Sequence, residues 1–204
     1  MSWGDVVAPV LMRAEAEWAQ GVEDRAGTPG VARIDAYIRG PAGLGWPTVE
    51  VGPNARPKIP YRDDGDFAWC GAFTAFCWQA AGLDRKVRRD DFASTWRLWT
   101  WGRSADAAAK GRVFQRGGQG LVLLPGDVVI VKGPSKKPYG SHITLCVEPL
   151  PETSTYRTIE GNARGVLGPD GKRRGEGVVR NRRKVSDVAF TVRPGPGDLA
   201  RAVA

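Results

Sequence analysis

The sequence predicts an α+β domain in which N-terminal helices pack on an antiparallel β-sheet. Helical periodicity dominates the first half of the chain, and short β-branched segments separated by glycine and proline turns follow Gly102. Helices that precede strands in this way are typical of segregated α+β domains. The chain has 204 residues, of which 42% are hydrophobic, enough for one compact core without disulfide or metal support.

Four helices are predicted from apolar spacing and from residues typical of helix ends. In the second helix, Thr28 is a suitable N-cap and the proline after it suits the first helical position. Gly82 ends the third helix, and Asp91 or Ser94 caps the fourth. The predicted helices cover residues 9–20, 28–40, 69–81 and 90–101.

Five strands are predicted in the second half of the chain, each short and bounded by turn residues. Between the second and third helices, residues 41–66 lack a clear period and are rich in glycine, proline and charge, which predicts a long irregular loop. The predicted strands cover residues 127–132, 142–148, 155–159, 178–182 and 188–193.

Positive charge is concentrated toward the C-terminus of a chain whose net charge is +8. The last 54 residues hold 11 basic and six acidic side chains, and the densest basic stretch runs from Lys172 to Lys184. One interpretation is a solvated face or hairpin. The other is attraction to a polyanion, either nucleic acid or an anionic envelope polymer.

The lengths of the apolar runs and the number of cysteines argue against membrane insertion, a signal peptide and disulfide bonds. The longest uncharged apolar runs, such as Val6–Met12, are far shorter than the ~20 residues that span a bilayer, so we expect no membrane insertion. Asp5 stands where a signal peptide carries basic residues, so we expect synthesis in the cytoplasm without such a peptide. Three cysteines without a C-x-x-C pair indicate free thiols rather than a disulfide framework.

His142 is the only histidine, so any imidazole chemistry depends on it. It opens the predicted strand 142–148 directly after a glycine-containing turn, which places it at the end of the sheet beside a loop. The alternative is a structural histidine that is hydrogen-bonded at a strand end.

Cys70 is the favoured nucleophilic thiol. It lies in the first turn of the third predicted helix, where free backbone N–H groups and the helix dipole stabilise a thiolate. Cys77 lies seven residues further on, about 10 Å along the helix axis, so the two cannot form a disulfide. Cys77 and Cys146 are interpreted as small buried hydrophobes. One histidine and three scattered cysteines do not form a zinc site, and no cofactor is expected.

Glu160 and Asn162 are candidates to orient His142. They follow the predicted strand 155–159, which is expected to pair with the strand that His142 opens. Because antiparallel neighbours connected by a turn bring their far ends together, Glu160 returns toward His142. A cysteine nucleophile needs a base and a third group that holds that base. The alternative for Glu160 is a surface carboxylate at a strand end.

Several motifs taken together resemble the CHAP family, the cysteine, histidine-dependent amidohydrolases and peptidases related to NlpC-type wall peptidases. The resemblance covers residues 66–162, and its order and spacing are matched along that stretch. Ser141 and Trp69 depart from residues common in the family. The motifs are Asp66-Phe67-Ala68-Trp69-Cys70-Gly71, Leu124-Pro125-Gly126-Asp127, Ser141-His142-Ile143 and Ile159-Glu160-Gly161-Asn162.

The resemblance implies a papain-like fold and a single catalytic domain over residues 1–204. Residues 1–60 would form a helical leader and loop, 66–162 the catalytic core, and 163–204 basic C-terminal strands. It also implies that Cys70 is the nucleophile, that His142 is the base and then the acid, and that Glu160 orients the imidazole with Asn162 as an auxiliary or alternative.

Peptidoglycan amide bonds are the substrates that the resemblance implies, with the bacterial cell wall as the partner of a monomeric, phage-endolysin-type enzyme. No metal or organic cofactor is implied. Without a signal peptide, such an enzyme reaches the wall after release or delivery by another system. Whether it cuts between sugar and peptide or within the peptide is left open.

Two rival functions come from other readings of the same residues. A basic nucleic-acid-binding module would use the stretch from Lys172 to Lys184 on phosphates, but the sequence has no helix-turn-helix, finger or RNA-binding strand motif, which argues against it. The same cysteine machinery could also act on a non-wall amide, as in an effector toxin, a protein peptidase or a deamidase.

Overall fold

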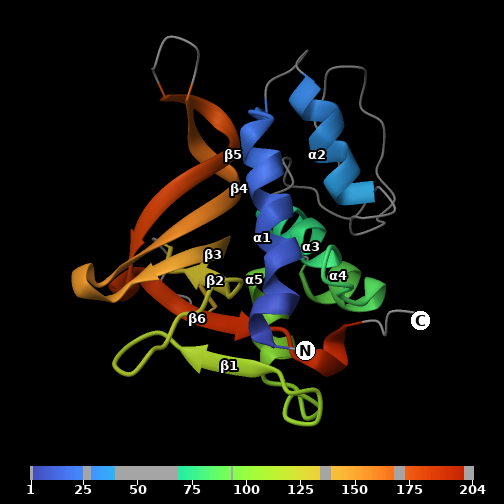
Figure 1. The fold of residues 1–204 in the computed structure, drawn as a ribbon, viewed down its shortest axis with the longest axis vertical. Helices are drawn as coiled ribbons and strands as arrows, with labels where there is room; N and C mark the ends of the chain where they lie inside the picture. The colour runs from blue at the N-terminus through green and yellow to red at the C-terminus, as the bar shows by residue number, and fades with distance from the viewer. Residues whose placement is uncertain are drawn as a thin grey trace.

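The computed structural model describes residues 2–24, 29–39, 69–92, 94–133, 139–167 and 173–199. The predicted loop 41–66 and the predicted cap Thr28 lie outside these residues. Within them, five α-helices and a six-stranded antiparallel sheet form an α+β fold. Figure 1 shows α1, α2 and α3 together on one side of the sheet. The predicted fold class, with N-terminal helices packed on an antiparallel sheet, is confirmed.

The sheet has the strand order β1-β6-β2-β3-β4-β5, and every neighbouring pair is antiparallel. The last strand along the chain, β6, therefore lies inside the sheet between β1 and β2, whereas β1 and β5 are the edge strands. The strands are β1 Val113–Arg116, β2 Val128–Val131, β3 His142–Leu150, β4 Thr155–Leu167, β5 Arg173–Lys184 and β6 Val188–Arg193.

The helices differ from prediction mainly at their ends. The first helix begins at Trp3 instead of Pro9, because Ser2 and Asp5 form a capping box and the proline is accommodated inside the helix. The predicted helix 90–101 is two helices, the second of which is capped by Ser94. The helices are α1 Trp3–Ala19, α2 Pro29–Arg39, α3 Cys70–Gln79, α4 Arg85–Asp91 and α5 Thr95–Gly102.

The strands β3, β4 and β5 are longer than predicted, and β1 lies where no strand is predicted. The strand β1 is only four residues long, with no buried residue, so its sequence carries little strand signal. The strands β4 and β5 continue well beyond the predicted segments and pair with each other over their lengths. The described part of the basic stretch forms β5, in line with the interpretation of that stretch as a hairpin.

The hydrophobic core lies between the helices and one face of the sheet. Every residue of α3 from Cys70 to Trp78 is buried, so this helix is the centre of the domain. The strands contribute alternate residues, including Ile143 and Leu145 from β3 and Ile159 from β4. A smaller cluster around Tyr156 covers the opposite face of the sheet.

Two glycines allow the start of α3 to pack closely against its neighbours. A β-carbon on Gly71 would lie 2.0 Å from the carbonyl oxygen of Phe92. A β-carbon on Gly161 of β4 would lie 2.5 Å from the β-carbon of Phe73 and 2.7 Å from the Trp69 ring. All three distances are shorter than real β-carbons show, so Gly71 sets how near α3 approaches Phe92 after α4, and Gly161 sets how near it approaches β4.

We expect Gly161→Ala to destabilise the protein by about 1–3 kcal/mol, because the added methyl group overpacks the contact between α3 and β4. Equilibrium unfolding in urea measures this difference. The matched control is Gly4→Ala in α1, where the new β-carbon meets only the Ser2 hydroxyl oxygen at 3.6 Å. The control should be neutral or stabilising by roughly 0.5–1 kcal/mol. Equal stability of Gly161→Ala and wild type would contradict the close packing.

Candidate active site

Cys70 is the first residue of α3, and its neighbour Trp69 is the N-cap. Trp69 is 1% exposed, and its indole N–H donates a hydrogen bond to Asp24 at 2.9 Å. Burial of the Trp69 ring and its hydrogen bond to Asp24 therefore fix the residue that precedes Cys70. Cys70 is 5% exposed, whereas Cys77 and Cys146 are fully buried. Of the three cysteines, only Cys70 lies at a helix start, and it is the least buried.

His142 is the first residue of β3, as predicted, and it contacts Glu160 of β4. The distance between His142 Nε2 and Glu160 Oε2 is 3.1 Å. The turn that connects the two strands covers residues 151–154, and Leu145 pairs with Ile159. This register places Glu160 on the diagonal from His142, on the same face of the sheet.

Glu160 is completely buried and is bound by three further side chains. Arg183 of β5 donates from Nε to Oε1 at 2.6 Å and from Nη2 to Oε2 at 2.5 Å. The Thr158 hydroxyl donates to Oε1 at 2.5 Å, and Asn181 donates from Nδ2 to Oε2 at 3.4 Å. The Glu160 carboxylate therefore lies between the His142 ring and the Arg183 guanidinium.

Asn162 occupies an irregular position in β4, and no hydrogen bond joins it to His142 in the described structure. Between Glu160 and Ala163 the register with β5 shifts by one residue, which is a β-bulge. Asn162 has φ 56°, a left-handed conformation that asparagine tolerates better than most residues. Its buried Oδ1 has no hydrogen-bond partner among the described residues. Of the two predicted orienting residues, only Glu160 is hydrogen-bonded to the ring.

The surroundings of Cys70 favour its ionised form. Burial alone would raise the pKa of this thiol, but hydrogen bonding to His142 and the imidazolium charge outweigh burial. Backbone N–H groups of Ile143 and Gly71 act in the same direction. The net effect is a Cys70 pKa below its ordinary value of 9.0.

The pKa of His142 moves in the opposite direction. Burial acts to lower it, but hydrogen bonds and charges of Cys70 and Glu160 raise the pKa of His142 from 6.5 to about 10. Burial would raise the pKa of Glu160, yet Arg183 and then His142 lower it from 4.5 to about 2. The raised pKa of His142 favours an imidazolium at neutral pH, and the lowered pKa of Cys70 favours a thiolate beside it. Because Glu160 holds Nε2, the ring offers Nδ1 to the thiol.

The other two cysteines are in surroundings that suppress ionisation. Burial is the main cause of a raised pKa at both Cys77 and Cys146, and neighbouring carboxylates act in the same direction. Both side chains lie in hydrophobic clusters. This is the behaviour expected of small buried hydrophobes.

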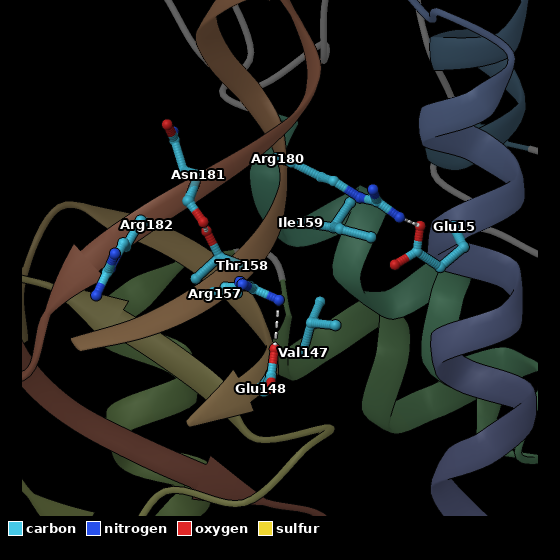
Figure 2. A pocket seen from close by; sticks show the side chains of 9 residues that line it. All are labelled: Glu15, Val147, Glu148, Arg157, Thr158, Ile159, Arg180, Asn181 and Arg182. Carbon is cyan, nitrogen blue, oxygen red and sulfur yellow. Dashed lines mark hydrogen bonds and ion pairs between the residues drawn. The ribbon is translucent and has the colours of Figure 1, made fainter. Parts of the chain in front are cut away.

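Three residues of the site were not predicted, namely Thr158, Asn181 and Arg183. The alternation of side chains along β5 could have suggested one of them, because Arg180 and Asn181 must point to opposite faces of the sheet. Figure 2 shows this alternation: Arg180 reaches Glu15 of α1, while Asn181 points away from that helix. The choice of Arg183 as the partner of Glu160 needs the position of the bulge in β4, which no sequence pattern predicts.

The pocket drawn in Figure 2 is separate from these contacts. It has a volume of about 440 Å³ and lies between α1 and the face of β3, β4 and β5 opposite to Glu160. Its cations already have partners, since Arg157 is paired with Glu148 at 2.7 Å and Arg180 with Glu15. It holds no residue pair suited to covalent chemistry.

We expect iodoacetamide to alkylate Cys70 at neutral pH faster than Cys77 or Cys146, because its pKa is lowered and theirs are raised. In His142→Asn the thiol loses its hydrogen bond and the neighbouring charge, so its pKa rises. Its rate at pH 7 should fall by about tenfold for each unit of that rise. The two rates should converge at a pH above the pKa of the variant thiol. Peptide mass spectrometry after timed alkylation measures each cysteine, and equal rates at pH 7 would contradict the contact with His142.

Glu160 should make stability depend on pH in the acid range. Its pKa in the folded state is lowered from 4.5 to about 2, so its contribution is complete above about pH 4.5 and is lost as the pH falls toward 2. The contribution should be on the order of 3 kcal/mol. Urea unfolding of wild type and Glu160→Gln at several pH values measures it. The stability difference between the two proteins should narrow below pH 4.5, and a constant difference would contradict the ionised state of Glu160.

Among the described residues, no group of three or more histidine, cysteine or acidic side chains is arranged to hold a metal ion. None of the helices in those ranges is both long and apolar enough to cross a bilayer. The chain matches no protein-family model and no curated protein sequence.

Proposed function

We propose that the chain is a cysteine-dependent amidohydrolase or peptidase that cleaves an amide bond of bacterial peptidoglycan. The observation that carries the proposal is the 3.1 Å contact between His142 Nε2 and the buried Glu160, together with the lowering of the Cys70 pKa by His142. Nucleophilic cysteine hydrolases use a thiol, a base and a group that holds the base. The choice of substrate depends on the resemblance to CHAP peptidases.

Acylation begins with attack of the Cys70 thiolate on the carbonyl carbon of the scissile amide. The resulting oxyanion would be stabilised by backbone N–H groups at the start of α3, including that of Cys70, which have no partner within the helix. As the C–N bond breaks, the His142 imidazolium donates its proton to the leaving nitrogen. The products of this step are a free amine and a thioester on Cys70.

Deacylation returns the enzyme to its starting state. Neutral His142 takes a proton from water, and the hydroxide oxygen attacks the thioester carbonyl. The C–S bond then breaks, so that the acid is released and the Cys70 thiolate forms again beside the imidazolium. Throughout both steps Glu160 stays ionised, holds Nε2 and balances the positive charge of the ring.

The charge of the protein suits a negatively charged polymer. A net charge of +8 raises the local concentration of an anionic wall or substrate, and this effect weakens with salt. Charge does not select the amide that is cut, so the same cysteine machinery directed at a non-wall amide remains the alternative. Both functions share the catalytic residues and differ only in substrate.

We expect purified protein to release soluble fragments from peptidoglycan, and Cys70→Ala and His142→Ala to be folded and inactive. The matched control is Cys77→Ala, which removes another buried thiol of α3 and should retain activity. Mass spectrometry of the fragments identifies the bond as amidase or endopeptidase cleavage. Wall hydrolysis by Cys70→Ala would refute the proposal. Fast Cys70 alkylation without cleavage of any peptidoglycan would instead favour a non-wall amide.

A further inference from the structure

We propose that Arg183 is a positioning residue of this site, whose guanidinium fork fixes the Glu160 carboxylate so that Oε2 faces His142. The inference rests on the proposed function, because it assigns Arg183 a role in orienting the histidine of that reaction. Arg183 forms no hydrogen bond with His142 in the described structure, so it acts through Glu160.

The fork restricts the carboxylate more than a single hydrogen bond could. Arg183 reaches both oxygens of Glu160, from Nε at 2.6 Å and from Nη2 at 2.5 Å. Such a pair of parallel hydrogen bonds fixes the plane of the carboxylate as well as its position. With that plane fixed, Oε2 faces His142 Nε2 at 3.1 Å.

The remaining neighbours of Glu160 complete a fixed arrangement. Thr158 supports Oε1 from β4, and Asn181 supports Oε2 from β5. The charged and titratable groups near the pair of Glu160 and Arg183 are His142 of β3, Tyr156 of β4 and Asp187 after β5. Arg183 is 27% exposed and Glu160 is fully buried, so the arginine closes the solvent side of the carboxylate.

The β-bulge at Gly161 and Asn162 places Arg183 on the same face as Glu160. Beyond the bulge Ala163 pairs with Gly177, and before it Tyr156 pairs with Arg183. If the register beyond the bulge continued unchanged, Arg183 would oppose Arg157 and point to the other face of the sheet. The irregular Glu160-Gly161-Asn162 segment therefore contains the carboxylate and also sets the register that brings Arg183 to the same face.

A positioning role and a purely electrostatic role predict opposite changes at His142. The charge of Arg183 repels an imidazolium, so removal of that charge alone would raise the pKa of His142. If Arg183 orients Glu160, its removal frees the carboxylate and deprives Nε2 of its acceptor. The pKa of His142 then falls. The sign of the change distinguishes the two roles.

The test is the NMR titration of the His142 imidazole, whose resonance is unambiguous because the chain has one histidine. In Arg183→Gln the midpoint should fall by about one pH unit or more. Arg183→Lys keeps the charge but cannot form the fork, so its midpoint should also fall. If Arg183→Gln does not fold, Arg183→Lys decides the outcome. An unchanged or raised midpoint in both variants would overturn the inference.

Two controls separate this role from general effects of charge. Arg182→Gln removes the same charge from the residue that precedes Arg183. Arg182 is exposed and donates hydrogen bonds to the hydroxyls of Thr155 and Thr153 at 2.9 and 2.8 Å. Its midpoint should match wild type. In a Glu160→Gln background, replacement of Arg183 should cause no further fall, and a fall of equal size there would overturn action through Glu160. None of these measurements uses peptidoglycan, so they are independent of whether the wall is the substrate.

Discussion

The arrangement of the site depends on one buried carboxylate that is shared by two cations. Glu160 is fully enclosed, and burial of a lone charge costs several kcal/mol unless it is paired and hydrogen-bonded. Arg183 on one side and His142 on the other provide that pairing. Burial acts to lower the pKa of the His142 ring, and Cys70 and Glu160 together keep the ring protonated at neutral pH, while the lowered pKa of Cys70 in turn depends on that ring. The three groups titrate as a coupled set.

The fold places these groups through close packing as much as through hydrogen bonds. The helix α3 is buried from Cys70 to Trp78, and Gly161 of β4 lets its first turn approach the sheet, while Gly71 lets it approach Phe92. Small shifts at that contact would move the sulfur relative to a ring held by β3. Backbone geometry thus controls a distance between side chains that come from elements far apart in the sequence.

Sequence reasoning reached the principal contacts because they follow from local rules. A cysteine after turn residues and before an apolar helix indicates a helix start, and a histidine and an acid at the far ends of a hairpin indicate neighbours. It failed where a single residue changes the outcome. The capping box at Ser2 makes α1 begin earlier than its apolar pattern predicts. The strand β1 has no buried residue, so its sequence does not indicate a strand. The bulge at Asn162 determines which face of β5 lies beside Glu160. Register along a long hairpin is a tertiary property, so Arg183 could not be found in advance.

The strand order also shows that the motif-bearing stretch 66–162 is not a separable unit. Without the residues that follow it, β2 would lose its partner β6 and leave a fully apolar strand, VVIV, at an open edge of the sheet. The carboxylate of Glu160 would lose its guanidinium at the same time. During translation the ribosome must therefore release both β5 and β6 before the cysteine, the histidine and the acid can be assembled. The arrangement of Cys70, His142 and Glu160 is consequently incomplete until the residues of β5 and β6 have been added to the chain.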